Sequence, residues 1–129
     1  MAKFRNAGQA CIGLNRLLVE DAVHDEFVDR YVARASALVT GNGIDPASQM
    51  GPLINDRALQ RVEAMTDRAR AQGAQLACGG NRHNAGAQFY APTVLTGVTQ
   101  DMDIAQQEIF GPVVATSTFK TEEEVLAVA

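Results

Sequence analysis

The sequence predicts an α/β fold in which an open, largely parallel, twisted sheet is flanked by helices. Short runs rich in Leu, Val and Thr alternate with two long segments whose apolar residues recur at helical spacing. Clusters of the turn-forming residues Gly, Pro and Asn separate these segments. Such alternation is typical of a layered architecture built on a parallel sheet. We interpret residues 1–129 as a single domain or the greater part of one.

The first half of the chain is expected to form a strand, a helix and a loop. Residues 14–19 are dense in Leu and Val and predict a buried strand. Asp21 can cap the following helix, whose apolar positions continue at helical spacing to Leu38. The segment 40–52 is rich in Gly and Pro, which is typical of a loop.

The second half is expected to hold one long helix and several strands. Asp56 is expected to cap this helix, and Gly73 to end it. The predicted strands are 74–78, 93–98 and 113–119. In the first of them Ala74, Leu76 and Cys78 would share one face, so Cys78 is expected to be a small core residue.

The chain ends inside a helical pattern. Thr121 and Glu124 have the spacing of a capping box, in which each side chain satisfies a backbone donor near the other. The apolar pattern that follows stops after barely two turns, and a helix this short is marginal in isolation. We therefore expect the chain to be a piece of a longer polypeptide.

Composition excludes several classes of function. The net charge is −4 with both signs interspersed, so no basic stripe predicts a nucleic-acid partner. No apolar run approaches the roughly 18 residues of a membrane helix. Two isolated histidines without a Cys/His cluster predict no metal site. Two distant cysteines argue against a disulfide framework, and we expect a reducing compartment, the cytoplasm.

Cys11 is the candidate nucleophile. It follows a turn at Gly8 and Gln9, and Arg5 lies six residues upstream. The thiolate is the reactive form of cysteine, and nearby positive charge or aligned backbone N–H groups lower the pKa that controls it. On local context alone the commoner role of a free cysteine, a small buried apolar residue, stays open.

A second candidate segment, Gln107-Glu108-Ile109-Phe110-Gly111-Pro112, stands just before the last predicted strand. The Glu108 carboxylate could accept hydrogen bonds from sugar hydroxyls, and the Phe110 ring could pack on a flat heterocycle. The alternative is that Phe110 is a core residue, Gly-Pro is a turn and Glu108 is merely exposed. Neither segment is strong alone, but together and in this order the two are specific.

These two segments, Gly8-Gln9-Ala10-Cys11 and Glu108-Ile109-Phe110-Gly111-Pro112, resemble the two signatures of the catalytic domain of the NAD(P)-dependent aldehyde dehydrogenases. Other stretches that fit are Gly41-Asn42-Gly43, Gly51-Pro52-Leu53-Ile54 and Phe89-Tyr90-Ala91-Pro92-Thr93-Val94-Leu95. The resemblance covers essentially the whole chain. It implies that residues 1–129 are a partial catalytic domain, without the cofactor-binding domain or the C-terminal part.

The resemblance implies a covalent mechanism. The Cys11 thiolate would attack the aldehyde carbon, hydride would pass to NAD or NADP, and water would hydrolyse the resulting thioester. Glu108 would hold the nicotinamide ribose, and Phe110 would help position the nicotinamide ring. The parent enzyme is expected to be a homodimer or homotetramer.

Arg5 is the only indication of which aldehyde is used. The stretch from Lys3 to Cys11 is similar to the succinate-semialdehyde dehydrogenase branch, where an arginine at this place pairs with the distal carboxylate of the substrate. A guanidinium suits that role because its planar fork binds carboxylates bidentately. The expected substrate is a small carboxylate-bearing aldehyde such as succinate semialdehyde. A surface or interdomain role for Arg5 is the alternative.

The family's general-base glutamate, oxyanion asparagine and dinucleotide-binding glycines lie upstream of the cysteine segment, and this chain contains none of them. We therefore expect the isolated chain to bind cofactor poorly and to be inactive. One alternative is a natural short chain that serves as a non-catalytic binding or assembly module. Another is a cysteine hydrolase with His24 or His83 as the base, although we expect no Asn or Asp to be placed to orient either ring.

Overall fold

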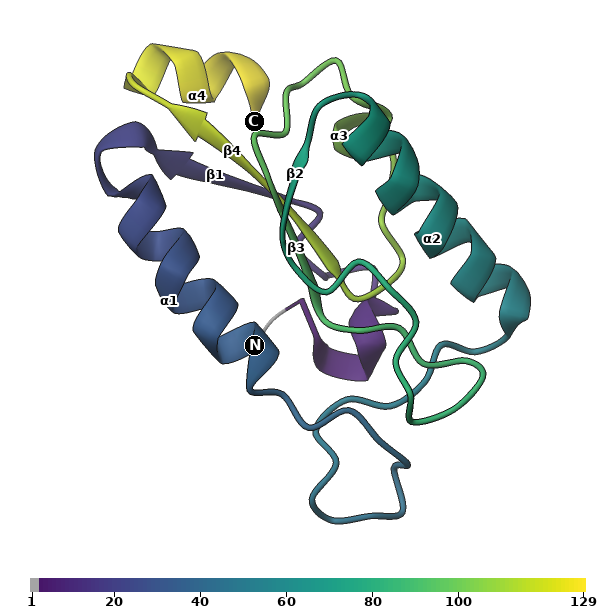
Figure 1. Ribbon diagram of the computed structural model, residues 1–129. Helices are drawn as coiled ribbons and strands as arrows, with labels where there is room; N and C mark the ends of the chain where they lie inside the picture. Colours follow the sequence, from purple (N-terminus) through teal and green to yellow (C-terminus); the bar gives the residue numbers. More distant parts are fainter. Residues whose placement is uncertain (1–2) are drawn as a thin grey trace.

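The computed structural model describes residues 3–129, and its central feature is a four-stranded sheet in the order β1-β4-β3-β2 (Figure 1). β1 pairs with β4 and β4 with β3 in parallel, whereas β2 pairs with β3 antiparallel. The predicted open, largely parallel sheet is therefore confirmed. The strands are β1 (Arg16–Glu20), β2 (Gln75–Cys78), β3 (Thr93–Thr96) and β4 (Val113–Phe119).

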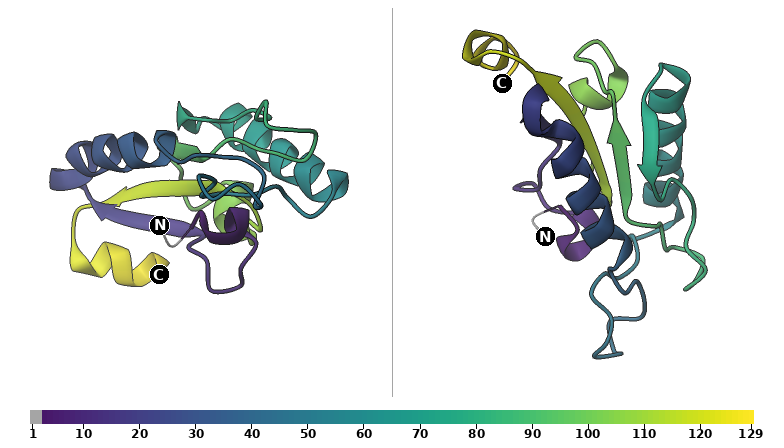
Figure 2. Two further views of the ribbon diagram at one scale, coloured as in Figure 1. Left: turned by 90° about the horizontal axis from the view of Figure 1, so that it is seen from below. Right: turned by 60° about the vertical axis from the view of Figure 1, so that its left-hand side comes forward.

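Helical segments connect and cover the strands. In Figure 1, β3 and β4 pass between the two long helices α1 and α2, and the left-hand view of Figure 2 shows α4 across β1 and β4 from α1. The helices are α1 (His24–Ser36), α2 (Asp56–Ala71), α3 (Asp103–Gln106) and α4 (Glu122–Val128), with short 3-10 turns at η1 (Arg5–Gly8) and η2 (Asp21–Val23).

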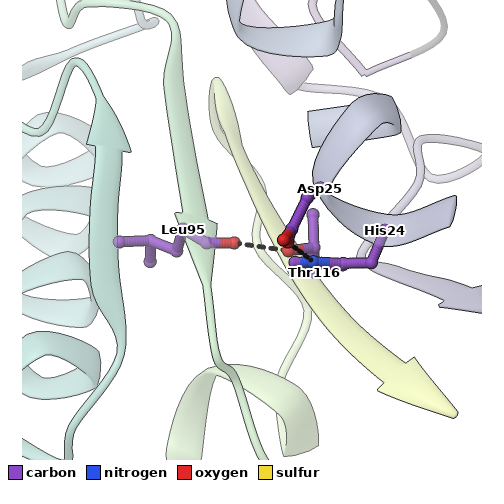
Figure 3. Close-up of polar contacts among 4 residues, drawn as sticks. All are labelled: His24, Asp25, Leu95 and Thr116. Carbon is purple, nitrogen blue, oxygen red and sulfur yellow. Dashed lines mark hydrogen bonds and ion pairs between the residues drawn. The ribbon is translucent and has the colours of Figure 1, made fainter. Parts of the chain in front are cut away.

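The core is centred on β3 and β4. Residues 93–95 and 113–117 are buried without alternation, which is the pattern of strands covered on both faces. The buried polar side chains among them are satisfied: the Thr116 hydroxyl donates to the Leu95 carbonyl at 3.1 Å (Figure 3). The apolar faces of the two long helices complete this core, with Ala35 near the end of α1, Leu38 just after it, and Leu59, Val62, Met65 and Ala69 from α2.

The first predicted strand is present, but the expectation that it is buried was wrong for most of its length. β1 begins at Arg16 rather than Leu14, and only Val19 within it is fully buried. Leu14 precedes the strand and is 39% exposed. The reason is topological, because β1 is an edge strand of the described sheet and pairs with β4 alone.

β2 also departs from the predicted alternation. Ala74 is buried but precedes the strand, whereas Leu76 is 38% exposed. A register shift between Leu76 and Cys78 adds a residue to this strand and breaks the two-residue period. Cys78 is half-buried against the core, as expected, and burial raises the pKa of its thiol.

The helix starts were predicted to within a few residues, but two caps were assigned wrongly. Asn55, not Asp56, caps α2, because its side chain accepts a hydrogen bond from the Ala58 N–H at 2.9 Å. Asp21 lies in η2, and α1 starts at His24 without a side-chain cap.

At α4 the predicted capping box is confirmed on the threonine side. The Thr121 hydroxyl accepts from the Glu124 N–H at 3.2 Å. The Glu124 carboxylate accepts from the N–H of Lys120, one residue before the cap, at 2.7 Å. Within residues 3–129 no helix combines the length and apolarity needed to cross a membrane.

Candidate active site

Cys11 lies in a tight turn between η1 and β1. The Gly13 N–H donates to the Ala10 carbonyl at 2.9 Å and closes the turn around Cys11 and Ile12. The residue is exposed, so its thiol can meet a molecule that approaches from outside. This exposure argues against the alternative of a buried structural cysteine.

The turn in front of Cys11 has an unusual backbone. Asn6 and Ala7 have φ values of 51° and 53°, in the left-handed region that side chains other than glycine rarely adopt. The side-chain amides of Asn6 and Gln9 lock this turn, because each donates to the backbone carbonyl of the other at 3.0 Å. Backbone strain of this kind persists only where neighbouring contacts hold it, and it clusters at functional sites.

Gln9 ties the same turn to the loop before α2. Its side-chain nitrogen donates to the Pro52 carbonyl at 3.3 Å, and its side-chain oxygen accepts from the Ile54 N–H at 2.9 Å. The glutamine in front of the cysteine therefore has a structural role: it fixes the position of the segment that carries Cys11.

The two candidate segments meet at a pair of glycines. Gly8 has φ +73°, and a Cβ placed on it would lie well inside 3.0 Å of the Gly111 carbonyl oxygen. Gly111 is itself packed against α2, where a Cβ would clash with a methyl group of Val62. Only glycine allows this close stacking of two backbones on a helix.

Side chains on either side of Cys11 also hold the backbone of the second segment. The Lys3 ammonium donates to the Ile109 carbonyl at 2.7 Å, and the Asn15 side-chain oxygen accepts from the Ile109 N–H at 3.1 Å. From α2, Arg61 donates to the Glu108 carbonyl at 2.8 Å. Lys3 is only 1% exposed, and burial lowers its pKa to about 8, although the nearby negative charge of Glu108 acts in the opposite direction.

Glu108 and Phe110 are presented outward. Ile109 between them is 1% exposed and belongs to the core, whereas Phe110 is 39% exposed and Glu108 is exposed. The alternative that Phe110 is a core residue is therefore wrong. Its ring lines a groove of about 530 Å³ together with Asn6, Gln9, Pro52, Leu53, Ile54 and Gln88.

Arg5 is exposed and lines a second groove, of about 560 Å³, with Asn6, Ala10 and Ile12. Ala10 and Ile12 are the chain neighbours of Cys11, so Arg5 and the cysteine turn border the same groove. The structure thus brings Arg5 and Cys11 to one surface, and it ties this surface to the segment of Glu108 and Phe110.

The two histidines lie elsewhere. His24 Nδ1 is 3.0 Å from the Asp25 carboxylate, so the expectation that no carboxylate could orient this ring was wrong (Figure 3). The His83 Nδ1 accepts from the Ala85 N–H at 3.2 Å. Neither histidine lines the groove beside Cys11, so this arrangement lends no support to the hydrolase alternative. Among residues 3–129 no three His, Cys, Asp or Glu side chains are grouped to hold a metal ion.

Comparison with known proteins points to one family. A family model described as "Aldehyde dehydrogenase family" matches residues 1–129. The mitochondrial succinate-semialdehyde dehydrogenase of Oryza sativa is 41% identical over 99% of the chain and 24% of its own length. The 3-sulfolactaldehyde dehydrogenase of Pseudomonas putida is 42% identical over 100% of the chain and 26% of its own length.

A solved structure agrees. The succinate-semialdehyde dehydrogenase from Burkholderia pseudomallei superposes with a TM-score of 0.97 at 44% identity, covering 99% of this chain and 27% of that one. The chain therefore spans about a quarter of the length of the relatives it matches.

Proposed function

We propose that this chain, which belongs to the aldehyde dehydrogenase family, is the nucleophile-bearing part of an NAD(P)-dependent enzyme that oxidises a small carboxylate-bearing aldehyde such as succinate semialdehyde. Enzymes of this family use NAD(P). The observation that supports the proposal most is the contact of Gly8 with Gly111, because it joins the segment of Cys11 to the segment of Glu108 and Phe110.

Cys11 is proposed as the nucleophile. Its sulfur would form a bond to the aldehyde carbon, and the former aldehyde hydrogen would then leave with its electron pair to the oxidised cofactor. The thioester that remains would react with water to release the acid and regenerate the thiol. The exposure of Cys11 in a turn supports this role, because the carbonyl carbon must come into contact with the sulfur.

Arg5 is proposed to bind the distal carboxylate of the substrate. It borders the same groove as the neighbours of Cys11, and a guanidinium on this surface could hold an anionic end while the aldehyde lies at the thiol. The names of two relatives, succinate-semialdehyde and 3-sulfolactaldehyde dehydrogenase, both refer to aldehydes with an acidic group at the other end.

Glu108 and Phe110 are proposed to contact the nicotinamide end of the cofactor, which accepts the hydride when bound. The residues fit such a group: an exposed aromatic ring lines a groove, and an exposed carboxylate two residues away can accept hydrogen bonds from ribose hydroxyls. Their backbone is held from three directions by Lys3, Asn15 and Arg61.

Several properties of the native enzyme belong to the same proposal. We expect the isolated chain to be inactive, because the resemblance assigns the general base and most of the cofactor site to segments outside it. We expect the native enzyme to be a cytoplasmic homodimer or homotetramer.

The experiment uses the native polypeptide, meaning the complete translation product that contains residues 1–129. It is incubated with succinate semialdehyde and NAD⁺ or NADP⁺, and formation of the reduced cofactor is followed by absorbance. We expect turnover that Cys11→Ala abolishes and that the matched control Cys78→Ala retains. Turnover that survives Cys11→Ala would contradict the assignment. A native polypeptide without dehydrogenase activity would favour the alternative of a binding or assembly module.

The role of Arg5 is tested with two substrates of similar length. Arg5→Gln should raise the KM for succinate semialdehyde by about tenfold or more, because a hydrogen-bonded ion pair is lost. Its effect on butanal, which lacks the carboxylate, should be small. The control is Arg57→Gln, an exposed arginine of α2 that lines neither groove. Equal effects of Arg5→Gln on both aldehydes would contradict the role.

A further inference from the structure

We propose that Lys3 and Asn15 are positioning residues that hold the peptide groups of Ile109, and through them place Glu108 and Phe110 for the cofactor. This inference rests on the proposed function and deepens it, because it assigns a task to two residues that have no part in the chemistry itself.

The first support is that both backbone polar groups of Ile109 are satisfied by side chains. Its carbonyl accepts from the Lys3 ammonium at 2.7 Å and from the Gly111 N–H at 2.9 Å, and its own N–H donates to the Asn15 side-chain oxygen at 3.1 Å. Ile109 is 1% exposed, so water is a poor substitute for either partner. Removing the Asn15 side chain would take away the partner of a buried N–H, which is destabilising, and removing Lys3 would leave the carbonyl with the Gly111 N–H alone. The two side-chain bonds therefore contribute to fixing the position of this residue.

The second support is the origin of the two side chains. Lys3 precedes Cys11 in the chain and Asn15 follows it. Residues on both sides of the nucleophile therefore hydrogen-bond to the backbone of Ile109. Glu108 and Phe110 are the immediate neighbours of Ile109 and are exposed, whereas Ile109 itself is buried. Because Glu108 and Phe110 adjoin Ile109, fixing the Ile109 backbone also fixes the backbone positions of these two residues.

The third support is the burial of a charge. A lysine that is 1% exposed is rare in proteins, because removing an ammonium group from water is costly. Lys3 is held in this place by a short, charge-assisted hydrogen bond to a backbone oxygen. Glu108, whose negative charge acts on Lys3, lies next to the residue that Lys3 binds. The ammonium thus connects to this segment by one hydrogen bond and by a charge interaction.

The first test compares Lys3→Met with Lys120→Met in the native polypeptide. Lys120 is the only other lysine of the chain and is exposed, so the control makes the same chemical change outside the site. Lys3→Met should raise the KM for NAD⁺ or NADP⁺ by about tenfold, as expected for the loss of a charge-assisted hydrogen bond. The KM for the aldehyde and the rate of Cys11 alkylation without cofactor should change much less. Equal changes in all three quantities would overturn the inference.

A second pair of variants keeps the inference falsifiable if Lys3→Met does not fold. Asn15→Ala removes the acceptor for the Ile109 N–H, whereas Asn15→Asp keeps an acceptor oxygen at the same place. The cofactor KM should rise in Asn15→Ala and return toward the wild-type value in Asn15→Asp. Failure of Asn15→Asp to restore the KM, or an unchanged KM in Asn15→Ala, would overturn the inference.

A readout without turnover separates this inference from the proposed function. Hydrogen exchange measures the protection of the backbone amides in residues 109–111. Exchange there should rise about tenfold in Lys3→Met or Asn15→Ala and stay unchanged in Lys120→Met. If the wild-type polypeptide oxidises no aldehyde, the proposed function fails, and the exchange still shows whether Lys3 and Asn15 hold this segment. Unchanged exchange in both variants would overturn the inference even in an active enzyme.

Discussion

The backbone of Gly8 lies so close to the Gly111 carbonyl that a Cβ on Gly8 would overlap that oxygen. These two residues stand at opposite ends of the chain, in the only two segments that the sequence marks as candidates for chemistry. Their contact, together with the bonds from Lys3 and Asn15 to Ile109, means that the place of Cys11 relative to Glu108 and Phe110 is set by backbone packing.

Replacing Gly8 by alanine is expected to be severely destabilising. The new methyl group would meet the Gly111 backbone, and alanine is also disfavoured at φ +73°. The matched control is Gly97→Ala, at φ +64° with nothing within 4 Å of the added Cβ. The control should lose about 1 kcal/mol of unfolding free energy, and Gly8→Ala more than about 3 kcal/mol. Urea unfolding measures both, and similar losses would show that the two backbones are not in close contact.

Lys3 is expected to make stability depend on pH in the alkaline range. Its pKa is about 8 in the folded chain and near 10.5 when unfolded, so between these values the unfolded state binds more protons. The contribution of Lys3 to the free energy of unfolding should therefore rise with pH between these values, by up to about 3 kcal/mol. Below pH 8 this gain is absent.

The comparison with Lys3→Met isolates this effect. Burial raises the pKa of Cys78, Tyr31 and Tyr90, and these groups act in the opposite direction as pH rises. They are present in both proteins and cancel in the comparison. The unfolding free energy of the wild type minus that of Lys3→Met should therefore increase from pH 8 to pH 10.5. Urea unfolding at several pH values checks this, and a difference that does not change with pH would contradict the burial of a charged Lys3.

The cap of α2 can be tested by two adjacent substitutions. Asn55→Ala removes the acceptor for the Ala58 N–H and should lower the unfolding free energy by about 1 kcal/mol. Asp56→Ala removes only a charge in the first turn and should lower it by less. Thermal or urea unfolding of both variants measures these losses. A larger loss of unfolding free energy for Asp56→Ala would indicate that Asp56 is the cap, as expected from the sequence.

The two cysteines should differ in reactivity. Cys11 is exposed, whereas Cys78 is half-buried and burial raises its thiol pKa. At pH 8, iodoacetamide should therefore alkylate Cys11 about tenfold faster or more, because the thiolate is the reacting form and must be accessible. Peptide mass spectrometry over a time course measures both rates. Faster modification of Cys78 would contradict the described placement of the two thiols.

Much of the fold could be predicted because its signals are local. The segment 113–119, rich in β-branched residues, and the helical spacing of apolar residues over 23–38 and 59–69 led to elements that the structure contains. The errors arise where local signals are ambiguous. Asn55 and Asp56 are both good capping residues, and nothing local reveals the register shift between Leu76 and Cys78.

The candidate site could be predicted only in part. Cys11, Arg5, Glu108 and Phe110 were found through two short segments and a family resemblance, and their roles stay predictions. Lys3 and Asn15 were missed as contributors to the site, because each is ordinary in its local sequence. Their importance comes from Ile109, a partner near the other end of the chain, and such distant pairs have no periodic or spacing signal.

If Cys11 is the nucleophile, it carries the substrate as a thioester, and this intermediate can be trapped. The native polypeptide is mixed with succinate semialdehyde and oxidised cofactor, quenched in acid within one turnover, digested and analysed by mass spectrometry. We expect a succinyl group on the peptide with Cys11, present only when the oxidised cofactor was added and absent from the peptide with Cys78. A peptide with Cys11 that stays unmodified while the acid is formed would contradict it.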